Sequence, residues 1–400
     1  MLLTTAQYLF VRKSIPFTLF FLRYNAIILI ATLLMSFVAL FITVAHGEFS
    51  TLLLRRFLVM FQMLFTLIYV LPVLIKDEAK AFEEVSCLVC YAFALQGLIH
   101  ITGYLVPEVG DFLFEMQPVN IQAKVDDPSN NLDRFRLYAL CGSIFFELPA
   151  AYGVASILFF RLQLKDGQKY ITGLKSYIVC FLLIAGITLS GRTGFVGFFI
   201  GLFFYFLFRL GQISTILKNS WKIALAAILL VGVFYFILPS NTRNSLTEEV
   251  FPFAFEAYYN YVDEGRASTA SSDVLRLHYY PLAMRTWLVG EGVVADESRY
   301  GFSDAGYMND LIFGGIPFFI CLLIYQCLYF NRPLSIARKN KDPDSRIDYF
   351  CFLFLFAYIF VLNYKSTSLG TLHIVEVLYL FAGNSYIMRH NYKEDQEIIS

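Results

Sequence analysis

The chain has 400 residues, of which 58% are apolar and only 16% are charged, and its formal net charge is zero. With a mean hydropathy of +0.61, this composition excludes an ordinary soluble domain, and the zero net charge gives no indication of a nucleic-acid partner. The abundant aromatic residues, 43 Phe and 26 Tyr, suit lipid-facing surfaces and the headgroup layer. The sequence therefore predicts an all-α polytopic membrane protein.

Apolar runs that can cross a bilayer, which takes roughly 20 residues, follow one another along the chain. We expect about ten of them, near 25–45, 57–75, 83–104, 137–160, 176–190, 193–208, 222–239, 306–330, 348–364 and 371–388. The fifth and sixth are short and form a broken pair around Ser190-Gly191-Arg192-Thr193-Gly194. Gly194, Gly197 and Gly201 have the spacing of small residues that lets helices pack closely.

Basic residues in the short connections indicate the orientation. If both termini are cytoplasmic, about 19 of the 31 Lys and Arg residues fall in cytoplasmic segments. The chain then divides into seven transmembrane helices over 1–239, an extracytoplasmic loop with short helices over 240–305, and three helices with a cytoplasmic tail over 306–400. Because long loops in compact proteins commonly carry function, we expect the chemistry in the 240–305 loop.

Arg192 stands just outside the membrane, at the N-terminal end of the sixth predicted helix. A helix N-terminus offers unpaired N–H groups and the positive end of the helix dipole, and a guanidinium adds a bidentate phosphate donor. Together these features predict an anion site. The alternative is a snorkelling arginine that orients the helix.

In the long loop, Ser271-Ser272-Asp273 is a capping sequence for a helix over 274–280. On such a helix Arg276 shares a face with Tyr279 and Tyr280. Arg276 is a candidate anion ligand, and the alternative is an ion pair with Asp273 inside the loop.

His278 and Arg285 lie on roughly the opposite face of that helix. Arg276 and Arg285 therefore approach one ligand only if Pro281 kinks the segment. His278 is either a candidate substrate ligand or a polar side chain packed among aromatic rings.

Two short motifs follow in the loop. Leu288-Val289-Gly290-Glu291-Gly292 is a tight glycine turn, and Ser303-Asp304-Ala305-Gly306-Tyr307 leads into the eighth predicted span. Asp304 is expected at the membrane boundary, either as a base with a raised pKa or as an N-terminal helix cap.

Ionisable groups inside apolar spans are unfavourable and therefore point to function. Glu147 is expected in the middle of the fourth span, where it pairs, handles a proton or locks two helices together. His373 and Glu376, at i and i+3 in the last span, are expected to form another polar lock.

In order and spacing, these motifs resemble the O-antigen polymerase and O-antigen ligase superfamily. The resemblance rests on the Ser-Gly-Arg-Thr-Gly helix start, the long loop with an Arg, the Leu-Val-Gly-Glu-Gly turn, Ser-Asp-Ala-Gly-Tyr and Gly314-Gly315-Ile316, and it covers roughly 176–325. It implies a bacterial inner-membrane glycosyltransferase of GT-C-like fold with a periplasmic active face. The implied partners are oligosaccharides linked to undecaprenyl diphosphate, membrane lipids and a polysaccharide co-polymerase that regulates chain length.

Transfer from a lipid diphosphate needs positive charge at the leaving group and a base for the acceptor hydroxyl. On this resemblance Arg192 and Arg276 are assigned to the diphosphate, with Arg285 as a third arginine, and Asp304 is assigned as the base. We further assign His278, Tyr279 and Tyr280 to substrate binding. Competing candidates for the base are Glu256, Asp263, Asp273 and Asp296. No metal ion or other cofactor is expected.

Ligases of this superfamily usually carry a histidine shortly before the corresponding span, where this chain has Asp304; His278 lies earlier. This difference favours a polymerase that transfers a glycan from undecaprenyl diphosphate to the non-reducing end of a lipid-linked repeat unit. The alternatives are the O-antigen ligase, which acts on the lipopolysaccharide core, and a flippase or transporter of lipid-linked sugars. A transporter is expected to show internal repeats and charged groups at midplane depth.

Overall fold

The computed structural model describes residues 15–47, 59, 80–126, 134–140, 146–165, 170–210, 240–266, 268–293, 298–301, 303–339, 343–379 and 382. These residues form helices and connections, and no β-strand occurs among them. The chain divides into two compact units: a first unit of Met1–Ser86 with Leu275–Ser400, and a second unit of Cys87–Val274. The predicted all-α class is confirmed for the described residues.

Four helices of the described residues are long and apolar enough to cross a membrane. They are α2 (Ile15–Ala45), α4 (Ala81–Leu105), α16 (Gly306–Lys339) and α17 (Pro343–Lys365). Two shorter apolar helices, α8 (Leu174–Ser190) and α9 (Thr193–Phe208), form the expected broken pair. The chain is thus a membrane protein. The expected span at 222–239 lies outside the described residues, as do nearly all of 57–75 and the last part of 371–388.

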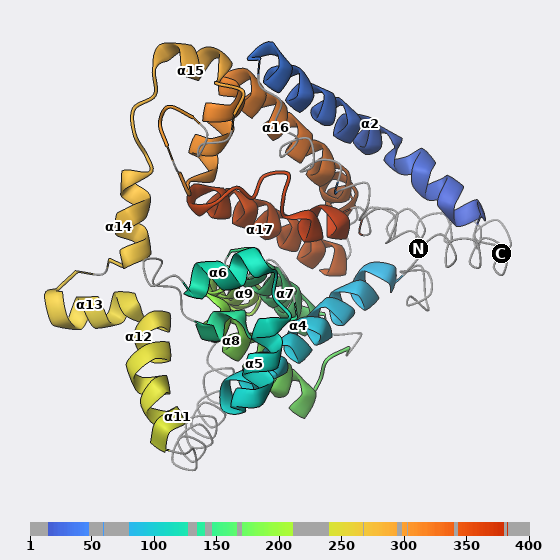
Figure 1. Ribbon diagram of the computed structural model, residues 1–400. Helices are drawn as coiled ribbons and strands as arrows, with labels where there is room; N and C mark the ends of the chain where they lie inside the picture. The colour runs from blue at the N-terminus through green and yellow to red at the C-terminus, as the bar shows by residue number, and fades with distance from the viewer. Residues whose placement is uncertain are drawn as a thin grey trace, which may run out of the picture. The chain divides into compact units, whose positions relative to one another are not determined.

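In the first unit, α16 packs against both α2 and α17 (Figure 1). The short α15 (Met284–Val289) packs against the first part of α16, and a further helical segment covers 373–379. Aromatic side chains make part of the contacts between these helices: the ring centroids of Phe330 in α16 and Phe356 in α17 lie 4.4 Å apart, and those of Phe352 in α17 and Tyr379 lie 5.1 Å apart.

A break divides α16 at Gly315, whose φ of 64° lies outside the helical region. Pro317 lacks an N–H group, so the carbonyl of Phe313 loses its usual helical donor. The N–H groups of Glu291 and Gly292 instead donate to the carbonyls of Ile312 and Phe313, at 2.7 and 2.9 Å. The predicted glycine turn therefore docks onto the interruption in α16.

Glycine makes this docking possible on both sides. A Cβ atom on Gly290 would lie 2.3 Å from the carbonyl oxygen of Phe313, and one on Gly315 would lie 2.8 Å from the carbonyl oxygen of Trp287. Real Cβ atoms do not approach other atoms so closely, and Gly290 also has a positive φ of 73°. The two backbones can touch only because neither position carries a side chain.

In the second unit, α7 (Glu147–Leu164) packs against α8 and, most extensively, against α9. A Cβ atom on Gly197 would lie 2.4 Å from the Cα of Gly153, and one on Gly201 would lie 2.7 Å from the ring of Phe160. A Cβ on Gly194 would also be crowded, at 2.9 Å from the Ile187 side chain. The predicted role of these three glycines in close helix packing is confirmed.

Besides most of α4, short helices make up the rest of the second unit. They are α5 (Pro107–Glu115), α6 (Val119–Asp126), η3 (Arg134–Leu137), α11 (Ser240–Ser245), η5 (Leu246–Val250), α12 (Phe251–Ala254) and α13 (Glu256–Glu264). The last one, α14 (Ala270–Leu277), runs into the first unit. Phe135, Leu189 and Val250 form a buried cluster where η3 and the end of α8 meet the 246–253 segment.

Two local predictions were wrong. Glu147 is the first residue of α7 and is exposed, so it is not in the middle of a span; a carboxylate in the first turn suits the helix dipole. The cap of α14 is Thr269: its hydroxyl accepts the N–H of Ser272 at 3.1 Å, and the hydroxyl of Ser272 accepts the N–H of Thr269 at 2.9 Å. This capping box starts the helix earlier than predicted, and α14 ends at Leu277 instead of continuing to 280.

Candidate functional site

Arg192 lies in the connection between α8 and α9, where Gly191 adopts a φ of 158°. Its guanidinium forms an ion pair with the carboxylate of Glu256, the first residue of α13. Both side chains are mostly buried, with 19% and 23% exposed. The arginine singled out at the helix break therefore carries a carboxylate counter-ion, and Glu256, a candidate base, is engaged with it.

A second arginine, Arg136, shares an aromatic ring with Arg192. The guanidinium carbons of Arg136 and Arg192 each lie 5.0 Å from the ring centroid of Phe253. Arg136 also donates from Nε to the carbonyl oxygen of Ser190, at 3.2 Å, which ties η3 to the end of α8. Two cations thus meet on one ring beside the helix break, in an arrangement that cation–π attraction stabilises.

This cluster, Arg136, Arg192, Phe253 and Glu256, has the chemistry of an anion site. Guanidinium groups carry their N–H donors in planar forks, which match phosphate oxygens, although Nε of Arg136 is already bonded to Ser190 and Arg192 to Glu256. The Glu256 carboxylate offsets the positive charge of Arg192. Sequence reasoning missed Arg136 because it placed this residue at the edge of a predicted span; the Arg134-Phe135-Arg136 alternation, with Phe135 buried, was the available signal.

In the first unit, His278 and Asp304 contact each other across 26 residues of sequence. The backbone N–H of Asp304 donates to Nδ1 of His278 at 3.0 Å, and the Asp304 carboxylate lies 3.7 Å from the same nitrogen. Since Nδ1 accepts a hydrogen bond, its lone pair is in use and the ring proton is assigned to Nε2. The Asp304 side chain is 55% exposed, whereas that of His278 is only 13% exposed.

Tyr279 and Tyr280 hold the His278 segment in place. Tyr279 stacks on Tyr364 of α17 with ring centroids 4.9 Å apart and donates its hydroxyl to the Tyr364 carbonyl at 2.7 Å. Burial, together with the nearby Tyr364 and Tyr307 hydroxyls, raises the pKa of Tyr279, so the phenol remains a donor. Tyr280 stacks on Tyr300 at 5.6 Å. Both rings are therefore used in packing.

Arg276 and Arg285 are exposed, and neither guanidinium group forms a hydrogen bond or ion pair with another described residue. They belong to separate helices, α14 and α15, with the Pro281 segment between them. The predicted ion pair of Arg276 with Asp273 is absent from the described contacts. The predicted sharing of one helix face by Arg276, Tyr279 and Tyr280 is wrong, because α14 ends at Leu277.

A group of loop residues that sequence reasoning missed centres on Arg299. Its Nε pairs with Glu291 at 2.6 Å, and its Nη2 donates to the hydroxyls of Thr286 at 2.8 Å and Tyr300 at 3.0 Å. Thr286 in turn donates to Glu291 at 3.1 Å. These contacts hold α15 and the glycine turn together.

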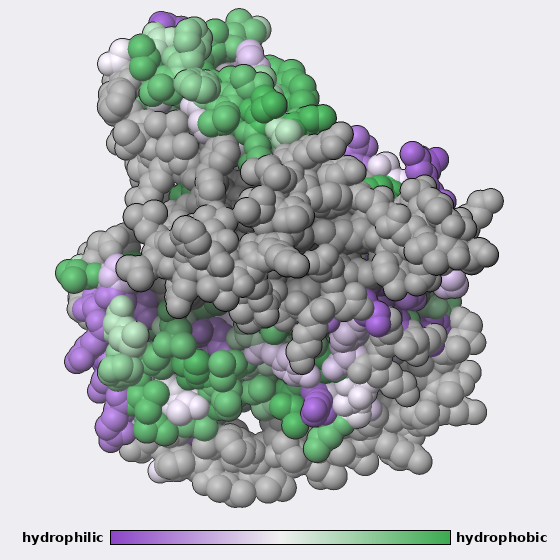
Figure 2. Space-filling view, turned by 90° about the vertical axis from the view of Figure 1, so that its right-hand side faces the viewer, coloured by the Kyte–Doolittle hydropathy of each residue, from purple (hydrophilic) through white to green (hydrophobic). Residues whose placement is uncertain are grey.

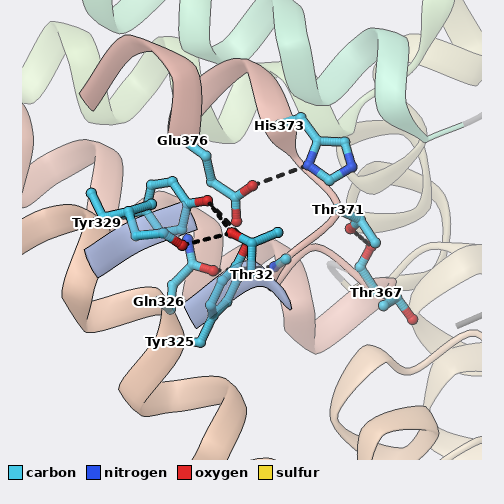
Figure 3. A network of polar contacts seen from close by, with 10 residues as sticks. Thr32, Tyr325, Gln326, Tyr329, Thr367, Thr371, His373 and Glu376 are labelled. Carbon is cyan, nitrogen blue, oxygen red and sulfur yellow. Dashed lines mark hydrogen bonds and ion pairs between the residues drawn. The ribbon is translucent and has the colours of Figure 1, made fainter. Parts of the chain in front are cut away.

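Buried polar groups also meet between the helices of the first unit (Figure 3). The Thr32 hydroxyl of α2 lies 3.3 Å from the hydroxyl of Tyr325 and 3.1 Å from that of Tyr329, both on α16. His373 and Glu376 form the expected pair, with Nδ1 and Oε2 3.0 Å apart. The carboxylate of Glu376 points toward the Thr32 and tyrosine hydroxyls.

This network has unsatisfied atoms among the described residues. Oε1 of Glu376 and Nε2 of Gln326 are buried and have no hydrogen-bond partner there, although Oε1 of Gln326 accepts from the N–H of Gly370 at 3.1 Å. Elsewhere the network ties α2, α16 and the 367–376 segment together, as a polar lock should.

Within the described residues, no group of three or more His, Cys, Asp and Glu side chains is arranged to hold a metal ion. No protein-family model and no curated protein matches this chain. Two clusters carry the candidate chemistry: Arg136–Arg192–Glu256 in the second unit and His278–Asp304 in the first.

Proposed function

We propose that the chain is a membrane glycosyltransferase that polymerises a bacterial surface polysaccharide of O-antigen type. It transfers a glycan from undecaprenyl diphosphate to the non-reducing end of a lipid-linked repeat unit. In this proposal the chain has about ten transmembrane helices in a GT-C-like fold. It lies in the bacterial inner membrane with both termini cytoplasmic, and its active face is periplasmic.

The observation that carries the proposal is the pair of guanidinium groups on Phe253, beside the break between two apolar helices. A lipid-linked diphosphate carries its negative charge at the membrane boundary, which is where a break between membrane helices exposes polar backbone groups. In the transfer, the acceptor hydroxyl oxygen forms the new bond to the anomeric carbon as the bond to the diphosphate oxygen breaks. Arginines stabilise the charge that develops on this leaving group.

The remaining roles follow from the same chemistry. The acceptor hydroxyl gives up its proton, and we assign Asp304 as the base that takes it. His278, which holds the backbone of Asp304, is a positioning residue. The exposed Arg276 and Arg285 are further candidates to bind the diphosphate. When the diphosphate binds, its oxygens would replace the Glu256 carboxylate as the ion-pair partner of Arg192.

The O-antigen ligase is the second candidate, and a specific contact favours it. Ligases of the superfamily that the motifs resemble usually carry a histidine shortly before the corresponding span. The hydrogen bond between His278 and Asp304 brings a histidine to that position in space, although not in sequence. The polymerase remains our first choice because Asp304, not a histidine, occupies the motif itself.

Deletion of the gene, followed by gel analysis of the surface glycan, tests the proposal. Loss of a polymerase leaves lipopolysaccharide core with a single repeat unit, whereas loss of a ligase or a flippase leaves bare core. The site assignment is tested by complementation with Arg192→Ala and Arg192→Lys. We expect neither variant to restore long chains, because lysine cannot reproduce a planar bidentate donor. Bare core after deletion would refute the polymerase assignment. Normal ladders from both variants, at equal protein abundance, would refute the role of Arg192.

A further inference from the structure

One side of α15 faces α16, and the other side is apolar and exposed. Thr286 is fully buried and Gly290, four residues later on the same face, contacts the backbone of α16. Met284 and Leu288 lie roughly opposite this face. The outward side chains are exposed by 74% for Met284, 38% for Trp287, 55% for Leu288 and 49% for Val289. Four large apolar side chains on a six-residue helix are an unusual surface for an aqueous loop.

The position of α15 relative to the bilayer follows from the hydrogen bonds between the turn after α15 and α16. The N–H groups that follow α15, those of Glu291 and Gly292, donate to the carbonyls of Ile312 and Phe313. These carbonyls lie at the start of an uncharged stretch of α16, residues 311–330. Such a stretch is about 30 Å long, which is the thickness of the hydrocarbon core. The end of α15 therefore lies at the depth where the hydrocarbon region of α16 begins.

The exposed face of α15 continues an exposed face of α16. Ile316, Ile320 and Ile324, spaced four apart, are exposed by 40%, 49% and 57% and form one stripe along this membrane helix. The head of the stripe adjoins α15, because a Cβ on Gly315 would lie within 2.8 Å of the Trp287 and Leu288 backbone. Hydrophobic residues predominate in the upper part of Figure 2, at the height of the upper end of α2 in Figure 1.

The polar groups of the segment suit a membrane environment. The N–H of Gly290 donates to the carbonyl of Thr286 at 3.0 Å, and the N–H groups of Glu291 and Gly292 donate to carbonyls of α16. These backbone N–H groups therefore have protein acceptors, which a bilayer requires because its core offers no water. The side chains of Glu291 and Thr286 bond to Arg299 and to each other. Arg285 and Trp287 are residue types that settle at the headgroup layer.

From these observations we propose that residues 284–293 form a re-entrant segment, in which the outward face of α15 contacts the acyl chains of bilayer lipids. The lipid that covers the exposed stripe of α16 also covers Met284, Trp287 and Leu288. This assignment does not depend on the proposed function. It moves the segment from the predicted extracytoplasmic loop into the edge of the membrane.

The chain has two tryptophans, Trp221 and Trp287, so Trp221→Phe leaves Trp287 as the single reporter. The full-length variant is reconstituted into phosphatidylcholine vesicles with either plain or brominated acyl chains. We expect brominated chains to reduce Trp287 emission by more than half, and aqueous iodide to reduce it little. Strong quenching by iodide with none by brominated lipid would overturn the proposal. Protection from both quenchers would also overturn it, because a protein surface would then cover α15.

Two further variants keep this test decisive. The first variant combines Trp221→Phe, Trp287→Phe and Leu288→Trp, so that the single tryptophan stands at position 288, on the side of α15 opposite Thr286. Brominated lipid should quench this tryptophan at least as strongly as it quenches Trp287. The second variant, a control, combines Trp221→Phe, Trp287→Phe and Glu264→Trp, so that the single tryptophan stands at the exposed polar end of α13. Iodide, and not brominated lipid, should quench the emission of this tryptophan. If Trp287 and this control respond alike, α15 does not lie in lipid.

Discussion

Nδ1 of His278 accepts a hydrogen bond from the backbone N–H of Asp304 at 3.0 Å. The bond joins the residue after α14 to the second residue before α16, and the Ser303 hydroxyl donates to the His278 carbonyl at 3.3 Å. The donor in this bond is a backbone group, and the Asp304 side chain is 55% exposed. The two residues can therefore be tested separately.

Asp304→Asn should keep the backbone hydrogen bond to His278 but remove the base. We expect the rate of polymerisation to fall by about 10²–10⁴-fold, the usual contribution of a general base. His278→Asn retains a side-chain acceptor near the position of Nδ1 and should retain most of the activity, whereas His278→Ala should lose more. The measurement is chain extension of a labelled lipid-linked repeat unit in membranes. Full activity of Asp304→Asn would move the base elsewhere.

Arg136→Ala should raise the KM for the lipid-linked donor by about tenfold to a hundredfold, since a hydrogen bond to a charged group contributes about 1.5–3 kcal/mol. The matched control is Arg134→Ala, two residues away in η3. Arg134 pairs with Asp111 at 2.8 Å, but both side chains are about half exposed, so the pair adds little stability. Equal donor KM values for the two variants would exclude Arg136 from the anion site.

Glu256→Gln distinguishes a counter-ion from a base. If Glu256 neutralises Arg192, the amide should lower the KM for the anionic donor and leave kcat nearly unchanged, because the Glu256 side chain no longer competes with the donor's phosphates as an anion. Glu264→Gln, at the exposed end of the same helix, is the control. A folded Glu256→Gln protein without activity would instead identify Glu256 as the base.

Gly290→Ala tests the docking of the glycine turn onto α16. Both Gly290 and Gly301 have a positive φ, 73° and 78°, but a Cβ on Gly301 meets nothing within 4 Å. Gly301→Ala should therefore lower the free energy of unfolding by only about 1 kcal/mol, because alanine disfavours a positive φ. Gly290→Ala adds the clash with Phe313 and should destabilise the protein by about 1–3 kcal/mol more. Thermal unfolding of the purified variants measures the difference, and equal melting temperatures would contradict the docked arrangement.

Much of the helical architecture was predictable, because apolar length and small-residue spacing are local properties of a sequence. Helices α8 and α9 were expected as a broken pair, and Gly194, Gly197 and Gly201 were expected to pack closely, since both patterns appear within one or two turns. The pair of His373 with Glu376 was predictable for the same reason. Helix ends were less predictable: Glu147 lies in an apolar run, yet α7 begins there.

By itself, the sequence determined that the chain is an all-α membrane protein and that Arg192 stands at a helix break, because hydropathy and helix-breaking residues act over short distances. Tertiary structure alone decided which residues meet. Arg136 joins Arg192 on Phe253, His278 reaches Asp304, and Gly290 fits against the break at Gly315. Each of these contacts depends on how the chain returns between distant helices, and no periodic pattern in the sequence encodes that path.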